Sequence, residues 1–305
     1  MAMHWTTLDF LPHMSKTTKN DIGQSQLFGE HDDIDPARSL LDQLLTDSSL
    51  YRTGTEYRNL LDFVVRLRNF APFNAMLLQI QYPGLMYAAS ARDWRERFGR
   101  VPKRDARPLL ILWPFGPVAL VYDVDDTEGM PLTDGVNIFA ATGDMTQDRI
   151  RDFMPLLAKR NIESHWFDAG GGDAGYIEPV SRSTDEHSPN RYRIAINRNH
   201  DPAVQFATLT HELGHLFLGH FGGDRHLKIP HRTRPTLSQR EIEAESVAFL
   251  VCHRNRVRPM SERYLSQYVA EGVGVESLDL YQIMRAAGQV ETLLGLTAHT
   301  RFDRG

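Results

Sequence analysis

The residues with the clearest chemical potential are His211, Glu212 and His215, which form the pattern His-Glu-Leu-Gly-His. Side chains four residues apart lie on one face of a helix, so both imidazoles can reach one metal ion. The motif indicates Zn²⁺, which lowers the pKa of a bound water to about 7 and polarises a carbonyl. Glu212 is then expected to be the catalytic general base in peptide-bond hydrolysis.

A third protein ligand must come from elsewhere, because a catalytic zinc site takes three and leaves one position open. The related pattern with a third histidine needs glycine at position 218 and histidine at 221, where this chain carries Leu218 and Phe221. His220 misses that spacing by one residue, and on a continuing helix it would point away from the metal. A glutamate from a second helix is therefore expected.

The segment 239–249 supplies three candidate glutamates. Glu241 and Glu245 share a helix face with two alanines, and such small residues let this helix pack closely against the motif helix. We predict Glu241 as the third metal ligand and Glu245 as the partner of the distal nitrogen of a ligand histidine. Glu243, on the opposite face, and Glu245 are the alternative ligands. At least one of the three is expected on a solvated face.

The elements around the motif follow from hydrophobic periodicity. Asp201 and Pro202 are expected to begin the motif helix, with Asp201 as its N-cap. Residues 191–197 alternate and predict a strand, either an edge strand that pairs with extended substrate or a core strand without substrate contact. A histidine or tyrosine that donates to the transition state is also expected, and the candidates are His226, His231 and Tyr264.

The remaining pattern predicts an α+β protein. Helices are expected at 37–47, 54–70, 72–82, 90–99, 146–161, 260–272 and 277–295, and strands at 108–115 and 117–124. Turn-forming residues at 125–135 predict a boundary. We therefore expect a flexible tail (1–39), a small N-terminal α+β domain (40–132) and a zincin-like, mostly helical metallopeptidase domain (133–305).

Charge is distributed unevenly along the 305 residues, whose net charge is −5. Residues 51–110 carry eleven basic and five acidic residues, with nine aromatic residues among them. Basic grooves with aromatic platforms bind single-stranded nucleic acid, although aromatic residues at helical spacing are expected in the core. The predicted phosphate contacts, which could equally form a solvated face, are Arg95, Arg97, Arg100, Lys103, Arg104 and Arg107.

Composition excludes several classes of protein. With 41% hydrophobic and 24% charged residues, the chain is neither fibrous nor wholly disordered. No run reaches the about 18 apolar residues of a membrane span, so no membrane partner is expected. The single cysteine, Cys252, allows no internal disulfide and is expected to be a buried structural thiol. A cytoplasmic location is expected, because no secretory signal is visible.

The motif helix followed by Glu241 and Glu245 resembles the gluzincin metallopeptidases of the ImmA/IrrE kind, and still more the metallopeptidase half of ArdC antirestriction proteins. The resemblance implies a zincin-like fold and a protein or peptide substrate. The family roles fall on His211, Glu212, His215 and Glu241.

The N-terminal half is similar to the ArdC N-terminal domain, which implies single-stranded DNA as a partner. The residues that carry this resemblance are Asn69 to Leu78, Gln81, Trp94, Gly99 to Lys103 and the strand Leu-Leu-Ile-Leu-Trp-Pro-Phe. Family members usually have a Lys-Lys-Gly turn where this chain has Pro102-Lys103-Arg104-Asp105. Two alternatives stay open: a non-proteolytic antirestriction or DNA-protecting protein with structural zinc, and a regulatory protease that cleaves a repressor-like partner.

Overall fold

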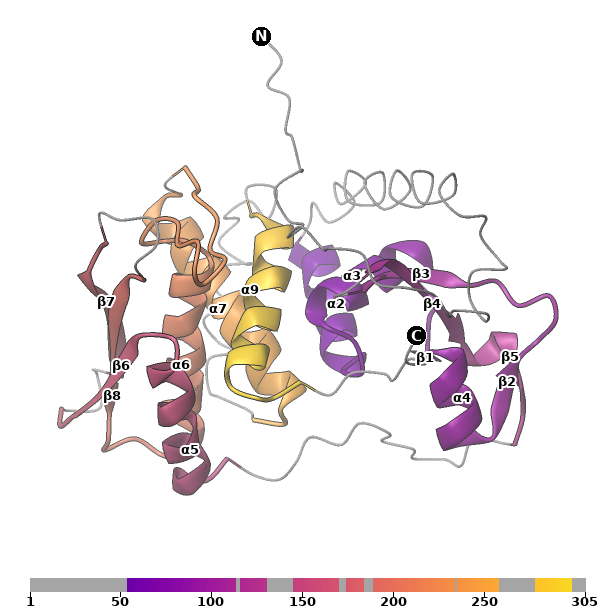
Figure 1. Cartoon of the computed structure of the whole chain (residues 1–305), viewed down its shortest axis with the longest axis horizontal. Helices are drawn as coiled ribbons and strands as arrows, with labels where there is room; N and C mark the ends of the chain where they lie inside the picture. The colour runs from indigo at the N-terminus through magenta and orange to yellow at the C-terminus, as the bar shows by residue number, and fades with distance from the viewer. Residues whose placement is uncertain are drawn as a thin grey trace, which may run out of the picture.

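The computed structural model describes residues 54–113, 116–130, 145–169, 174–183, 189–233, 235–257 and 278–297, drawn as coloured ribbon in Figure 1. The predicted tail, the helices at 37–47 and 260–272 and the boundary at residue 132 lie outside these ranges. The division into domains therefore stays a prediction. Helices and sheets are both present, which confirms the α+β class. Within these ranges no helix has the length and apolar character that a membrane crossing requires.

The described N-terminal part combines helices with two small sheets. Its elements are α2 (Gly54–Arg66), α3 (Pro72–Gln81), β1 (Ala88–Ala89), α4 (Ala91–Phe98), β2 (Arg100–Pro102), β3 (Leu109–Trp113), β4 (Gly116–Asp123), the short 3-10 helix η2 (Val124–Asp126) and β5 (Thr127–Gly129). The sheets have the orders β1-β4-β3 and β2-β5, with antiparallel pairs throughout. Gly99 ends α4 in the left-handed conformation, which a glycine adopts without strain.

Two amide side chains of α3 cover the outer edge of β3. Asn74 donates to the carbonyl of Leu112 and accepts from its N–H, both at 3.0 Å. Gln81 pairs with Leu110 in the same way, at 2.7 and 2.8 Å. The side chains thus take the place of a neighbouring strand and protect the edge from pairing with another chain.

The C-terminal part places helices beside a mixed sheet. Its elements are α5 (Gln147–Ala158), β6 (Ile162–Phe167), β7 (Gly175–Ser181), β8 (Arg191–Asn197), α6 (Pro202–Phe217), α7 (Leu237–Arg254) and α9 (Leu280–Leu293). Strand β8 pairs parallel with β6 and antiparallel with β7. The helices and β8 were expected, whereas β6 and β7 were not.

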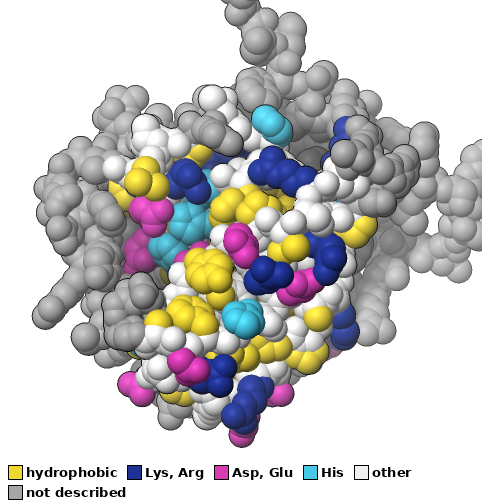
Figure 2. Space-filling view, turned by 90° about the vertical axis from the view of Figure 1, so that its left-hand side faces the viewer, with side chains coloured by type: hydrophobic (Ala, Val, Ile, Leu, Met, Phe, Trp, Pro, Cys, Tyr) yellow, Lys and Arg dark blue, Asp and Glu magenta, His cyan; other side chains and the backbone are white. Residues whose placement is uncertain are grey.

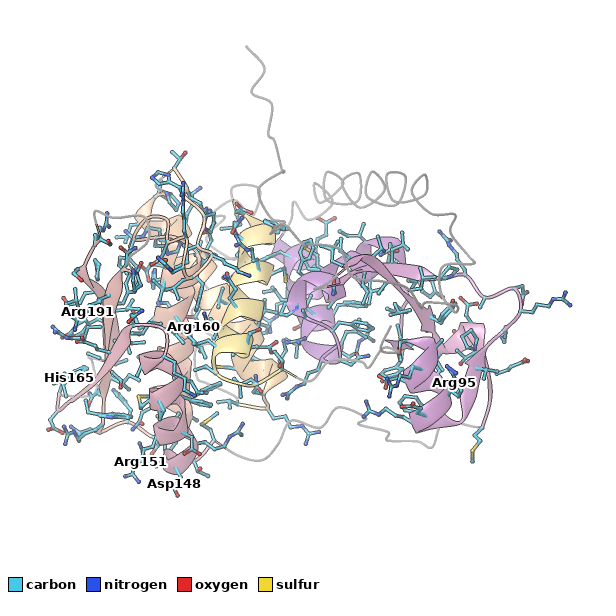
Figure 3. All side chains as sticks on the ribbon, viewed as in Figure 1. Arg95, Asp148, Arg151, Arg160, His165 and Arg191 are labelled. Atoms are coloured by element: carbon cyan, nitrogen blue, oxygen red, sulfur yellow. The ribbon has the colours of Figure 1, made fainter. Side chains whose placement is uncertain are left out.

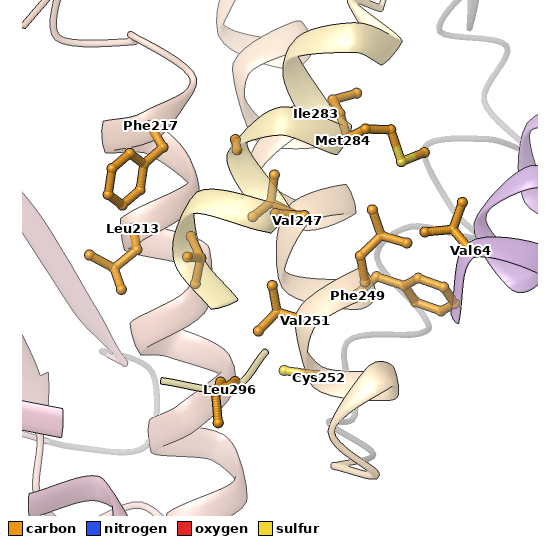
Figure 4. Packing of buried hydrophobic residues seen from close by; sticks show 14 of the residues in the cluster. Val64, Leu213, Phe217, Val247, Phe249, Val251, Cys252, Ile283, Met284 and Leu296 are labelled. Atoms are coloured by element: carbon orange, nitrogen blue, oxygen red, sulfur yellow. The ribbon is translucent and has the colours of Figure 1, made fainter. Parts of the chain in front are cut away.

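One hydrophobic cluster runs through the described residues of both parts. Figure 4 shows its contributions from Leu213 of α6, Val247 of α7, Met284 of α9 and Val64 of α2. In Figure 1, α7 and α9 lie between α6 and the α2–α3 pair, with the β6–β8 sheet at one end and α4 at the other. Cys252 is buried in this cluster, and burial raises its pKa to about 12, as expected for a structural thiol.

Candidate metal centre

Helix α6 presents two imidazoles to one point. It begins after Asp201 with Pro202 in its first turn, although the Asp201 side chain makes no capping hydrogen bond. The His211 side chain is 23% exposed, and that of His215 is 9% exposed. Their Nε2 atoms lie 3.1 Å apart, so the side chains one turn apart converge as the motif predicts.

Helix α7 brings the third candidate ligand to the same point. It starts with a capping box formed by Thr236 and Gln239. A Cβ atom on Gly214 of α6 would lie only 3.3 Å from the carbonyl oxygen of Ala244 on α7. These small residues allow the expected close packing of the two helices, and this packing turns the carboxylate of Glu241 toward the histidines.

The spacing of the three ligand atoms fits one divalent metal ion. Glu241 Oε2 lies 3.6 Å from the Nε2 atom of His211 and 3.6 Å from that of His215, and the whole group lies within 4.8 Å. Tetrahedral ligands at about 2.1 Å from zinc are about 3.4 Å from one another. Two imidazoles and one carboxylate also form a donor set of catalytic zinc sites that keep one position open.

Glu245 occupies the predicted place behind His211. Its Oε2 lies 3.2 Å from Nδ1 of His211, and its side chain is 11% exposed. A carboxylate in this position favours a proton on Nδ1 and leaves Nε2 free for a metal. The geometry thus matches the supporting role expected from the sequence.

His220 and Glu243 differ from the expectations. Helix α6 ends at Phe217 with Leu218 as its C-cap, and Gly219, with φ +76°, turns the chain so that His220 folds back onto His215. The two Nδ1 atoms lie 2.8 Å apart. Glu243 is fully buried and lies 3.1 Å from Nε2 of His220. The expectation of a solvated glutamate is wrong, because all three carboxylates of α7 face histidines.

Charge at the centre favours a bound cation. Burial alone would lower the pKa of His211, but hydrogen bonds to Glu241 and Glu245 raise it to about 10. The pKa of Glu241 falls well below its usual range because of its hydrogen bonds to His211 and His215. Burial lowers the pKa of His215 itself. Two carboxylates around buried imidazoles therefore stabilise positive charge at this point.

Glu212 lies between the metal centre and strand β7. Its carboxylate accepts a hydrogen bond from the backbone N–H of Ile177. Burial raises the pKa of Glu212 to about 7, with His211 opposing this rise and Glu241 adding to it. A carboxylate with a pKa near neutrality is suited to accept and return a proton.

Strand β7, not β8, forms the sheet edge beside the motif helix. Within the described sheet β8 lies between β6 and β7, so of the two alternatives for residues 191–197 the edge strand is wrong and the core strand is confirmed. Asn197 N–H donates to Ala174 O at 2.9 Å, and the alternation of an antiparallel pair then turns the backbone groups of Gly175 and Ile177 outward. Pro179 shares this register, where a missing N–H breaks no ladder bond.

The surface on the side of this sheet is chemically mixed. Figure 2 views the molecule from the side of the β6–β8 sheet and shows histidine side chains next to acidic, basic and hydrophobic ones. Tyr176 of β7 is 47% exposed. Of the candidate transition-state donors, His226 and His231 are exposed in the segment after α6, and Tyr264 lies outside the described residues. Their role stays a prediction.

The predicted phosphate contacts lie at the other end of the molecule, where Figure 3 labels Arg95 on α4. The Arg100 guanidinium makes hydrogen bonds within the protein: it donates to Thr127 Oγ1 at 2.8 Å and to the carbonyl of Met130 at 2.7 Å. Arg97 pairs with Asp93 at 3.8 Å, and the Lys103 Nζ donates to the carbonyl of Asp125 at 2.7 Å. The exposed members of the set are Arg95, Arg97, Lys103, Arg104 and Arg107.

Four of the nine aromatic residues considered as base-stacking platforms are part of the core. Tyr57, Phe63, Phe70 and Trp94 are buried, which supports the core interpretation for these four. Phe73, Tyr87 and Phe98 are partly buried, Tyr82 is 41% exposed, and Tyr51 lies outside the described residues. Stacking of nucleic-acid bases on the buried rings would require the core to open.

Comparison with known proteins places the metal centre in a recognised domain type. Residues 177–268 match the peptidase M78 model, described as the IrrE N-terminal-like domain. This match confirms the expected ImmA/IrrE resemblance, and it takes in β7 from Ile177 onward, α6 and α7. No curated protein sequence matches the chain.

Two crystal structures of the antirestriction ArdC protein from the R388 plasmid are similar to this chain at 15% sequence identity. The metal-free structure has a TM-score of 0.35, with 73% of this chain and 82% of that chain covered. The Mn(II)-bound structure has a TM-score of 0.40, with coverages of 87% and 96%.

The turn at Gly219 should be needed for metal binding. In Gly219→Ala the left-handed backbone costs about 1–2 kcal/mol, and the new Cβ would lie 2.8 Å from the carbonyl oxygen of Pro230. We expect about tenfold weaker metal affinity, because His220 moves away from His215. Gly295→Ala is the matched control, since Gly295 has φ +66° and no atom within 4 Å of the added Cβ. Equal metal affinities in the two variants, measured by chelator competition, would contradict this role.

Proposed function

We propose that this protein is a zinc-dependent metallopeptidase that hydrolyses peptide bonds. The observation that carries the proposal is the convergence of His211, His215 and Glu241 on one point, with the Glu212 carboxylate beside it. The IrrE N-terminal-like match of the same segment supports the peptidase class. A binding site for structural zinc alone would not need a carboxylate of raised pKa next to an open coordination position.

The chain's own residues have separable roles. When bound, zinc supplies the Lewis acidity that activates a water and polarises the scissile carbonyl. His211, His215 and Glu241 hold the ion, and Glu245 fixes the ring of His211 by its hydrogen bond. Glu212 takes a proton from the attacking water and returns it to the leaving amine. With zinc held by these three side chains, the Glu212 carboxylate would supply the base that hydrolysis needs.

Strand β7 gives the substrate class a structural basis. The outward backbone groups of Gly175 and the outward carbonyl of Ile177 can pair with an extended peptide, while the Ile177 N–H donates to Glu212. Gly175 allows β7 to cross α6 closely, since a Cβ there would lie 2.6 Å from Thr208 Cγ2. An extended peptide on this edge would run past the catalytic carboxylate, so we assign a protein or peptide substrate to the site.

Metal content and proteolysis test the proposal together. We expect about one zinc per chain in the purified protein, cleavage of an unfolded protein substrate, loss of cleavage with a chelator and recovery on addition of zinc. Glu241→Ala should lose the metal, whereas Glu178→Ala, an exposed residue of β7, should keep it. Stoichiometric zinc without any cleavage would favour the structural-zinc alternative, and cleavage of a repressor-like protein alone would favour the regulatory protease.

Single-stranded DNA binding is a second candidate function, favoured by the exposed lysine and arginine side chains around the β2–β3 connection. Charge reversal at Arg104 and Arg107 should weaken binding to an oligonucleotide. The slope of the logarithm of the binding constant against the logarithm of the salt concentration should also become shallower, by about one unit per lost phosphate contact. Arg100 is unsuitable for this test because it holds β2 to β5. The matched control reverses Arg151 and Arg160 on and after α5, at the opposite end (Figure 3). Equal losses in the two pairs, or no binding at low salt, would contradict the assignment.

A further inference from the structure

A buried side-chain network lies behind His215. His220 has 0% side-chain exposure, and its two ring nitrogens contact different partners. Nδ1 lies 2.8 Å from Nδ1 of His215, and Nε2 lies 3.1 Å from Oε2 of Glu243. His220 therefore connects a ligand of the metal centre to a carboxylate that does not touch the metal.

The contacts allow only one arrangement of protons when His215 binds a metal. A metal on Nε2 of neutral His215 requires the proton on Nδ1. That Nδ1–H must donate to Nδ1 of His220, which must then be the acceptor. The proton of His220 consequently lies on Nε2, where it donates to Glu243. Each hydrogen bond in the network thus has a defined direction.

The far end of the network is rigidly held. Arg232 donates to both carboxylate oxygens of Glu243, at 2.8 and 2.9 Å, and also to the carbonyl of Leu218 at 3.1 Å. The backbone N–H of Asp279, the N-cap of α9, donates to Glu243 Oε1 at 3.3 Å. Such a fork–fork pair fixes the carboxylate in position, so the acceptor for His220 is fixed as well.

The two ligand histidines are supported differently. His211 contacts the carboxylate of Glu245 directly, whereas His215 reaches that of Glu243 only through a second imidazole. Because a hydrogen bond to the distal nitrogen sets the tautomer and ring orientation of a ligand histidine, His220 has the position to do for His215 what Glu245 does for His211.

We propose that His220, fixed by Glu243 and Arg232, is a positioning residue that sets the tautomer and ring plane of His215 for metal binding. The inference rests on the proposed function, since it assumes that His215 binds zinc through Nε2. It assigns the segment between α6 and α7 to the metal centre, although none of its residues is a proposed ligand. It also gives a role to the buried Glu243–Arg232 ion pair, which lies away from the three candidate ligands.

Zinc affinity of the full chain tests the inference. His220→Leu removes both hydrogen bonds and should weaken zinc binding about 10- to 100-fold in competition with a chelator. His220→Asn keeps an oxygen near the position of Nδ1 and should recover most of the affinity. His165→Leu, the same change at an exposed histidine of β6 (Figure 3), should leave affinity unchanged. Circular dichroism of each metal-free variant identifies losses that come from unfolding.

The outcomes separate the inference from the proposed function. A wild-type chain without a zinc site would overturn both. A wild-type chain that binds zinc, with the same affinity in folded His220→Leu, would overturn the inference alone. If His220→Leu does not fold, ¹⁵N spectra of the histidine rings in the wild-type protein decide: we expect protons on Nδ1 of His215 and Nε2 of His220, and a proton on Nδ1 of His220 would refute the assignment.

Discussion

Glu212→Gln is expected to lower the rate of peptide hydrolysis by about 10²- to 10⁴-fold, the usual contribution of a general base. Glutamine is nearly the same size and keeps an oxygen that can accept from Ile177 N–H, so the fold should be retained. Its amide cannot take a proton from the attacking water. Because Glu212 is not among the three converging ligands, zinc content should stay at the wild-type level.

The controls for Glu212→Gln separate lost chemistry from lost structure. Glu163→Gln neutralises an exposed carboxylate of β6 that pairs with Arg193 at 3.7 Å, and it should keep full activity. Zinc analysis and thermal unfolding should give the same values for both variants and the wild-type protein. A Glu212→Gln protein that is fully active would show that another group accepts the proton. A Glu212→Gln protein without zinc would instead assign Glu212 to metal binding.

The sequence predicts the convergence of the candidate ligands well because much of the signal is local. His211 and His215 are one helical turn apart, and periodicity alone indicates that they converge. Glu241 comes from a different helix, but the alanines on its face predict the close contact that brings it there. Gly214 and Ala244 meet as expected. The pattern of small and polar residues on two helices is therefore sufficient to predict that these three side chains converge.

The sequence is less informative where tertiary contacts determine the type or the end of an element. Strand β7 contains Gly175 and Pro179, residues that usually argue against a strand, and only its edge position makes them acceptable. Without β7, residues 191–197 were free to be interpreted as an edge. Helical spacing places His220 on a continuing helix, whereas the helix stops before Gly219. A glycine just after a periodic run is a known end signal, so this residue could have been found.

The burial of Arg254 is a further feature that the sequence does not predict. It lies in the last turn of α7, where a basic residue usually faces solvent and interacts with the helix dipole. In the structure its side chain is 1% exposed and is paired with Glu291 of α9, also 1% exposed, at 2.8 Å. Its guanidinium also donates to the carbonyls of Val64 and Phe70, both at 2.7 Å. One arginine thus joins α7, α9 and the end of α2.

Replacing Arg254 by methionine is expected to lower the free energy of unfolding by about 3–5 kcal/mol, a large share of the total stability of a typical domain. The loss is large because Glu291 would keep a buried, unpaired charge and two buried carbonyls would lose their donors. Unfolding in urea, followed by circular dichroism, measures the change. Arg151→Met removes an exposed pair with Asp148 and should leave the midpoint unchanged, because exposed pairs contribute little.

The contacts of Arg254 also predict which elements lose stability when it is replaced. Its partners belong to both predicted domains, and one hydrophobic cluster runs between them. Hydrogen exchange should therefore accelerate in α2 and α3 as well as in α7 and α9 when Arg254 is replaced. The double variant Arg254→Met with Glu291→Met removes both charges and should recover part of the stability, since no charge is left buried alone. Faster exchange confined to α7 and α9 would show instead that the two parts unfold independently, and the metal centre would then gain no stability from the N-terminal helices.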